Sequence, residues 1–86
     1  MNSAEIQEHV YTWAQGRNFT APYGILKGEH TSTKGRPVKT VTFGRARTLD
    51  CGVNIYNRNF IIVETNRYGR VVCKSFEELM AYLETM

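Results

Sequence analysis

The sequence predicts an α+β domain in which an N-terminal helix and a C-terminal helix flank a four- to five-stranded, mainly antiparallel sheet. Three observations lead to this prediction. Apolar residues recur at helical spacing near both ends of the chain, they alternate with polar residues in the middle, and short turn sequences rich in Gly and Asn separate the middle segments. With 86 residues and 42% hydrophobic residues, the chain can build one core, so residues 1–86 are expected to form a single domain.

Residues 2–16 are expected to form an amphipathic helix. Asn2 or Ser3 can cap its N-terminus, and Glu5 stands three residues after Asn2, as a capping box requires. Gly16 is a natural end for this helix. The apolar stripe that would face the core consists of Ile6, Val10, Trp13 and Ala14.

The region that follows, residues 18–37, is divided by three glycines, Gly24, Gly28 and Gly35. A short strand is expected at 23–26, followed by a polar hairpin tip at 30–36.

Further segments have the pattern of strands. In residues 40–43 and 53–55, β-branched or aromatic residues alternate with polar ones. Residues 60–63 have no polar alternate, so both faces of this strand are expected to be covered, by helices on one side and loop on the other. A turn is expected before this strand at 57–59 and another after it at 66–69, and the last strand is expected at 70–74.

Gly44 interrupts the strand pattern, and an isolated Gly in a strand often marks a β-bulge. Without a bulge, Arg45 and Arg47 would continue on the core-facing side of the strand, where burial of each guanidinium group would cost several kcal/mol. A bulge would place them beside Thr40 and Thr42 on the open face of the sheet. We therefore expect a bulge at Gly44.

The chain is expected to finish with a short helix capped by Ser75, with Glu78 three residues later and an apolar stripe of Phe76, Leu79, Met80 and Leu83. The resulting order of elements is similar to that of the double-stranded RNA-binding domain. That family carries a Lys-rich start to its last helix, whereas Glu77 and Glu78 would repel phosphate here. The sequence therefore assigns the chain to no family.

Positive charge is concentrated in residues 34–47, which hold five of the eleven Lys and Arg residues and no acidic residue. Cations spaced along a strand can follow a phosphate backbone. The leading hypothesis is a non-enzymatic interaction module that binds nucleic acid, or a nucleic-acid-handling protein, through a basic sheet face and the hairpin tip. The residues of this predicted site are Lys34, Arg36, Lys39, Thr40, Thr42, Arg45 and Arg47. A solvated edge strand explains the same charges without a partner.

A second binding loop is predicted at Arg67, Tyr68 and Arg70, because Arg and Tyr are frequent at binding hot spots. An ordinary polar turn is the competing interpretation. An alternative function is a protein inhibitor or adaptor, of the kind common among phage and mobile-element accessory genes. Such a protein would dock through an exposed strand edge or through the acidic last helix, at Glu77, Glu78 and Glu84.

Catalysis is not expected. Asp50 and Glu64 have a spacing that resembles restriction-type nuclease cores, but the Lys expected two residues after the second acid is replaced by Asn66. A small metal-dependent nuclease is therefore a remote alternative. The four residues that could bind zinc, His9, His30, Cys51 and Cys73, lack the close spacing of a structural zinc site, and no glycine pattern matches a nucleotide-binding loop. No metal and no cofactor are predicted.

The longest apolar run, residues 60–63, is far shorter than the roughly 20 residues that span a bilayer, so no membrane association is expected. The polar N-terminus lacks the features of a signal peptide, which predicts a cytoplasmic protein with both cysteines as free core residues. An uncovered sheet edge could pair with a second copy, so a homodimer is left open.

Overall fold

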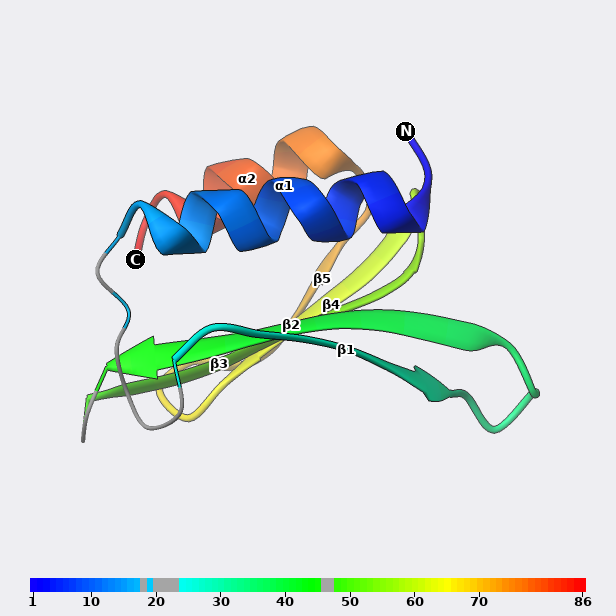
Figure 1. Ribbon diagram of the computed structural model, residues 1–86, viewed down its shortest axis with the longest axis horizontal. Coiled ribbons are helices and arrows are strands. Elements are labelled where there is room, and N and C mark those ends of the chain that lie inside the picture. The colour runs from blue at the N-terminus through cyan, green and yellow to red at the C-terminus, as the bar shows by residue number, and fades with distance from the viewer. Residues whose placement is uncertain (18, 20–23, 46–47) are drawn as a thin grey trace.

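The computed structural model describes residues 1–17, 19, 24–45 and 48–86. Within these described residues, two helices flank five strands, which confirms the α+β fold (Figure 1). In chain order, the elements are α1 (Ser3–Gln15), β1 (Leu26–Thr31), β2 (Pro37–Arg45), β3 (Leu49–Asn57), β4 (Phe60–Thr65), β5 (Gly69–Cys73) and α2 (Phe76–Leu83).

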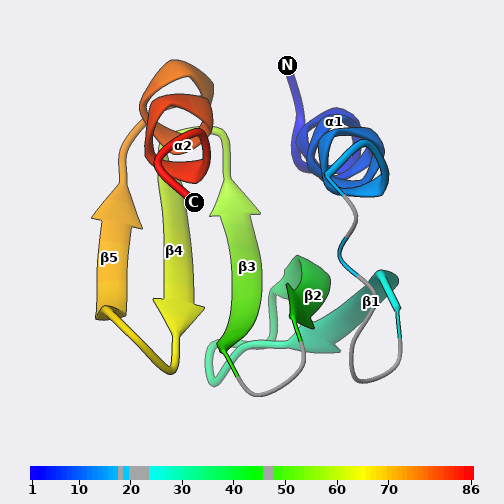
Figure 2. The ribbon, with the colours of Figure 1, turned by 90° about the vertical axis from the view of Figure 1, so that its left-hand side faces the viewer.

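The strands form one antiparallel sheet in the order β1-β2-β3-β4-β5, so each strand pairs with its neighbour in the chain. Both helices lie on the same face of this sheet, with α1 over the β1–β3 half and α2 at the β5 side (Figure 2). The other face, called the open face below, carries no helix from the described part of the chain. No helix in the described ranges is long and apolar enough to cross a membrane.

Both helices begin as the sequence predicts. Asn2 Oδ1 accepts a hydrogen bond of 2.9 Å from Glu5 N, and Glu5 Oε1 accepts one of 3.0 Å from Asn2 N, which completes the capping box. Ser75 Oγ accepts from Glu78 N at 3.0 Å at the start of α2. Gly16 is the C-cap residue of α1. Local sequence therefore sets these helix ends.

The core lies between the helices and the sheet. Aliphatic side chains of this kind contribute about 1.5–3 kcal/mol each when they are fully buried. The largest fully buried side chains of this layer are Ile6, Val10, Val41, Val53, Ile55, Ile61, Val63, Leu79 and Leu83. Of residues 60–63, which were expected to be covered on both faces, 61–63 are buried but Phe60 is 40% exposed. Ile62 points to the open face, where it lies between Asn54 of β3 and Val72 of β5.

The first hairpin begins later than the sequence predicts. β1 starts at Leu26, and His30 and Thr31 belong to it rather than to the tip. Tyr23, at the start of the predicted strand, lies outside the described residues. The tip itself is residues 32–36, where Gly35 has a φ of 78°. Gly69 has a φ of 73° at the predicted turn between β4 and β5.

The bulge expected at Gly44 is wrong. Phe43, Gly44 and Arg45 pair in unbroken register with Cys51, Asp50 and Leu49, and the register shift in this sheet falls instead between Ile55 and Asn57. Arg45 therefore lies on the helix-facing side of β2. It escapes burial because it is the last residue of the strand, is exposed, and places its guanidinium over the Phe19 ring, 4.7 Å from the ring centroid.

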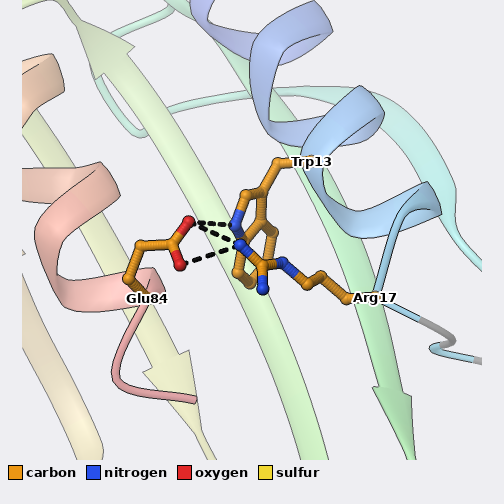
Figure 3. Close-up of polar contacts among 3 residues, drawn as sticks. All are labelled: Trp13, Arg17 and Glu84. Carbon is orange, nitrogen blue, oxygen red and sulfur yellow. Dashed lines mark hydrogen bonds and ion pairs between the residues drawn. The ribbon is translucent and has the colours of Figure 1, made fainter.

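The C-terminal ends of the two helices are joined by one carboxylate. Glu84 Oε1 accepts hydrogen bonds from Trp13 Nε1 at 2.8 Å and Arg17 Nη2 at 2.7 Å (Figure 3). Glu84 Oε2 accepts a further bond of 2.8 Å from the same Arg17 nitrogen. This contact fixes α2 beside α1 on the same side of the sheet.

Candidate functional site

The hairpin tip presents two cations on an ordered turn. Ser32 N donates to Arg36 O at 2.8 Å, Gly35 N donates to Ser32 O at 2.9 Å, and Arg36 N donates to Ser32 Oγ at 3.2 Å. Lys34 and Arg36 are exposed, and neither takes part in the ion pairs found among the described residues. Their charges are therefore available to a ligand.

The turn between β3 and β4 supplies two aromatic rings beside this tip. The centroids of Tyr56 and Phe60 lie 5.2 Å apart, with an angle of 58° between the ring planes. Asn57 Oδ1 accepts a bond of 2.8 Å from Asn59 N and holds the turn, in which Arg58 is exposed. Because the register shifts between Ile55 and Asn57, Phe60 pairs with Asn57 and lies at the start of β4, where 40% of its surface is exposed.

A concave region of about 450 Å³, called the tip groove below, lies between the hairpin tip and this turn. It is lined by Ser32, Thr33, Lys34, Arg36, Pro37, Tyr56, Asn57 and Phe60. This set combines two cations, three hydroxyls, one amide and two aromatic rings, with no carboxylate. Cations and hydroxyls bind phosphate oxygens, and exposed rings stack on unpaired bases.

The other described residues of the predicted basic face, Lys39, Thr40, Thr42 and Arg45, do not share one surface with the tip. Lys39 pairs with Ile55 and lies on the helix-facing side, where its Nζ is 2.7 Å from Glu29 Oε2. Arg45 lies on that side too, because without a bulge the period of two keeps it in phase with Val41. Thr40 pairs with Gly28 on the open face.

Thr42 lies on the open face as well, but its surroundings there are not basic. Asp50 and Glu64 line the adjoining concave region, and Arg70 Nε lies 4.0 Å from Glu64 Oε1. Among the residues that the structure describes, this part of the open face offers no row of cations to a phosphate backbone.

The structure brings one residue of the predicted basic face, Arg45, to two residues of the predicted second binding loop, Arg67 and Tyr68. Arg45, at the end of β2, lines the same small pocket as Arg67 and Tyr68, from the turn between β4 and β5. Arg70, by contrast, points to the open face beside Glu64. Arg47 lies outside the described residues. The sequence could not show this grouping, because it depends on β2 and the β4–β5 turn meeting at one end of the sheet.

Asp50 and Glu64, the acids of the remote nuclease alternative, line a shallow region of about 510 Å³ on the open face. Asn66, which stands where that interpretation requires Lys, is bonded to the backbone of Asp50: its Oδ1 accepts from Asp50 N at 2.8 Å and its N donates to Asp50 O at 3.1 Å. In the part of the chain that the structure describes, no three His, Cys, Asp or Glu side chains gather where they could hold a metal.

Both cysteines are buried free thiols. Burial raises the pKa of Cys51 to about 12, and burial together with the negative charge of Glu78 raises the pKa of Cys73. Cys51 pairs with Thr65 and Cys73 with Ile61, so the two thiols lie on different strands, offset by about 13 Å along β4. That offset exceeds the reach of a disulfide.

Comparisons with protein-family models, curated protein sequences and solved structures find no significant match. The interpretation of function therefore depends on the geometry of the tip groove. Its aromatic member Phe60 is absent from the predicted site, because the sequence shows it only as the start of an apolar strand. The turn residues that precede it are the one signal that could have placed it at an exposed edge.

Proposed function

We propose that the protein is a non-enzymatic interaction module that binds single-stranded nucleic acid in the tip groove. The observation that carries this proposal is that Lys34 and Arg36, both without a carboxylate partner in the described ranges, line one groove with the rings of Tyr56 and Phe60. The cations would contact phosphates and the rings would stack on bases.

The geometry favours a single strand over a duplex. A base can reach Phe60 only if it is unstacked from its neighbours, as it is in a single strand or a loop. A groove of about 450 Å³ falls in the size range of sites for ligands of nucleotide size. A duplex would meet only the cations at the tip's end of the sheet, since the uncharged Thr40 and Thr42 follow on the open face and Asp50 and Glu64 line its far end.

Fluorescence anisotropy with labelled single-stranded and duplex DNA and RNA, at 50 and 200 mM salt, tests this proposal. Two phosphate contacts predict a slope of log K against log salt of about −1.4 for a single strand, which is about a sevenfold loss of affinity over this range. The double variant K34Q/R36Q is expected to remove most of this dependence and most of the binding.

The control is R70Q, which removes one exposed Arg on the open face outside the groove, compared with the two cations removed in the double variant. Binding that is unchanged in R70Q but lost in K34Q/R36Q supports the tip groove. Equal losses in both variants would indicate non-specific attraction to a basic protein and would contradict the proposal. No binding of any strand at 50 mM salt would also contradict it.

A second candidate function is an inhibitor or adaptor that adds a partner strand, or a second copy, at the β5 edge. Val72 of this edge strand is 42% exposed. The β1 edge is less suitable, because Gln7 Nε2 of α1 donates to Gly28 O at 2.9 Å and Lys27 Nζ pairs with Glu8. Glu84 of the acidic last helix is also occupied, by Arg17 and Trp13.

We also propose the cytoplasm as the compartment. Cys51 and Cys73 are free thiols placed too far apart in register to bond to each other, and free thiols persist in a reducing environment.

A further inference from the structure

Two arginines from distant parts of the chain meet at the end of the sheet opposite the hairpin tip. Arg45, from the end of β2, and Arg67, from the turn between β4 and β5, line one pocket of about 130 Å³, called the end pocket below. The remaining lining residues are Thr48, Leu49, Tyr68, Thr85 and Met86. No Asp or Glu side chain is among them.

Each guanidinium rests on an aromatic ring rather than on a carboxylate. Arg45 lies over Phe19, 4.7 Å from the ring centroid, and Arg67 lies over Tyr68 at 5.8 Å. Neither belongs to an ion pair among the residues that the structure describes. A ring positions a planar guanidinium and leaves its N–H groups free to donate. Two cations that line one small space make it attractive to an anion.

The loops that carry these arginines are held by hydrogen bonds. Thr48 N donates to Arg45 O at 3.2 Å, and Tyr68 N donates to Thr65 Oγ1 at 2.7 Å. Thr85 Oγ1 donates to Tyr82 O at 2.6 Å, so it is not a donor to a ligand. The donors that remain for an anion are the two guanidinium groups, with the hydroxyls of Thr48 and Tyr68 in the same lining.

The volume of the end pocket selects the size of its ligand. About 130 Å³ is the space of roughly four water molecules in the liquid. A tetrahedral oxyanion fits this space, and a nucleoside does not. Paired arginines with hydroxyl donors are well suited to phosphate, whose oxygens accept two parallel N–H bonds from a guanidinium.

We propose that the end pocket binds a single phosphate group, either as inorganic phosphate or as a phosphate monoester whose remaining part stays outside the pocket. This site is independent of the proposed function of the tip groove. Arg36 and Arg45 are separated by the length of β2, about 30 Å at 3.3 Å per residue, so the two sites lie at opposite ends of the sheet.

The test is a titration of the ¹⁵N-labelled protein with sodium phosphate, followed by amide and Arg Nε–H shifts and compared with sodium chloride at equal ionic strength. We expect saturable shifts at Thr48, Arg67 and Tyr68 in phosphate only. R45Q and R67Q are each expected to weaken binding about tenfold or more, since each removes a charge-assisted pair of hydrogen bonds. R45K keeps the charge but loses the planar guanidinium group, so its affinity for phosphate should lie between those of the parent protein and R45Q.

The control R70Q removes an exposed Arg outside the end pocket and should leave the phosphate shifts unchanged. Equal shifts in phosphate and chloride, or shifts that persist in both R45Q and R67Q, would overturn the proposal. Thermal unfolding of each variant shows whether it is folded. If R45Q is not folded, the phosphate affinity of R45K tests the role of Arg45 instead.

Two further arms identify the source of the phosphate and separate this site from the tip groove. If a nucleoside 5′-monophosphate binds as tightly as inorganic phosphate, the ligand is a phosphate monoester whose base stays outside the pocket. If the nucleotide binds much more weakly, the ligand is inorganic phosphate. K34Q/R36Q is expected to keep the phosphate shifts in full. In the parent protein, saturable phosphate shifts without any nucleic-acid binding would contradict the tip groove alone, and nucleic-acid binding without phosphate shifts would contradict the end pocket alone.

Discussion

Trp13 and Glu84 are hydrogen bonded to each other at 2.8 Å although 71 positions separate them in the chain. The bond runs from the indole Nε1 of α1 to the carboxylate beyond the end of α2, and Arg17 donates to the same carboxylate (Figure 3). Because both helices lie on one face of the sheet, this carboxylate is the polar contact that joins them above a core of aliphatic side chains.

The variant E84A is expected to lower the free energy of unfolding by about 1 kcal/mol. An exposed ion pair contributes about 0–1 kcal/mol and a hydrogen bond about 1 kcal/mol, while the negative charge near the C-terminus of α2 is unfavourable and reduces the net effect. E84Q keeps an acceptor for Trp13 and should lose less. Urea unfolding measures both values, and an E84A variant as stable as the parent protein would show that this contact adds nothing.

Tyr82 carries the one buried side-chain polar atom without a hydrogen-bond partner in the described part of the chain, its hydroxyl oxygen. Burial is the first cause that raises the pKa of this phenol. Because Y82F removes an unsatisfied group and keeps the ring, it is expected to leave stability unchanged or to raise it by about 1 kcal/mol. Thermal unfolding checks this. A loss of more than about 1 kcal/mol would mean that the hydroxyl has a partner in solution.

Cys51 makes the free energy of unfolding depend on pH in the alkaline range. Burial raises its pKa from the ordinary 9.0 to about 12 in the folded protein. The unfolded thiol therefore releases its proton above about pH 9, whereas the folded one holds its proton until about pH 12, so stability present below pH 9 is lost as the pH rises through this window. The loss approaches about 1.4 kcal/mol per pH unit for one such group.

Urea unfolding between pH 8 and pH 11 measures this slope. The variant C51A is expected to show a shallower fall than the parent protein, even if its stability at pH 7 is lower because of the methyl-sized cavity it leaves. Cys73 and Tyr82, whose pKa values are also raised, account for a residual slope. Identical slopes with and without Cys51 would contradict the prediction.

Gly28 is fixed by a close approach to Thr40. A Cβ at position 28 would lie 2.8 Å from Thr40 Oγ1, closer than real contacts allow. G28A is therefore expected to destabilise the protein by about 1–3 kcal/mol, although Ala in a strand without this contact would be favoured over Gly. The double variant G28A/T40A should recover most of the stability that G28A loses. A G28A variant that is more stable than the parent would show that the Thr40 side chain moves aside at little cost.

Helices and turns were predicted well because their signals are local. The pair Asn2 and Glu5 defines a capping box whatever the rest of the fold does, and Gly69 reports a backbone conformation that few other residues adopt. The side of the sheet that the β2 residues after Gly44 face was not predictable in this way. The cost of burying Arg45 was real for a strand interior, but the strand ends at this residue and an aromatic ring covers the guanidinium.

The candidate sites depend on contacts that the sequence does not encode locally. The dense charge of residues 34–47 suggested one basic surface, but an extended strand spreads Arg36 and Arg45 over about 30 Å and sends alternate side chains to opposite faces. Arg45 instead lines one pocket with Arg67, and Lys34 lines another with Phe60, because antiparallel neighbours bring turns together at the same end of the sheet. A tally of charges along the chain cannot show these pairs.

Phe60 separates the proposed function from simple electrostatic attraction. Its ring is 40% exposed and lies 5.2 Å from that of Tyr56 in the tip groove. Stacking of one base on an aromatic side chain contributes about 1–3 kcal/mol, so F60A should weaken binding of a single strand by about tenfold or more while leaving the salt slope unchanged. V72A, which truncates a similarly exposed apolar residue on the open face, is the control. Anisotropy curves for F60A that overlay those of V72A would show that the groove binds phosphate alone.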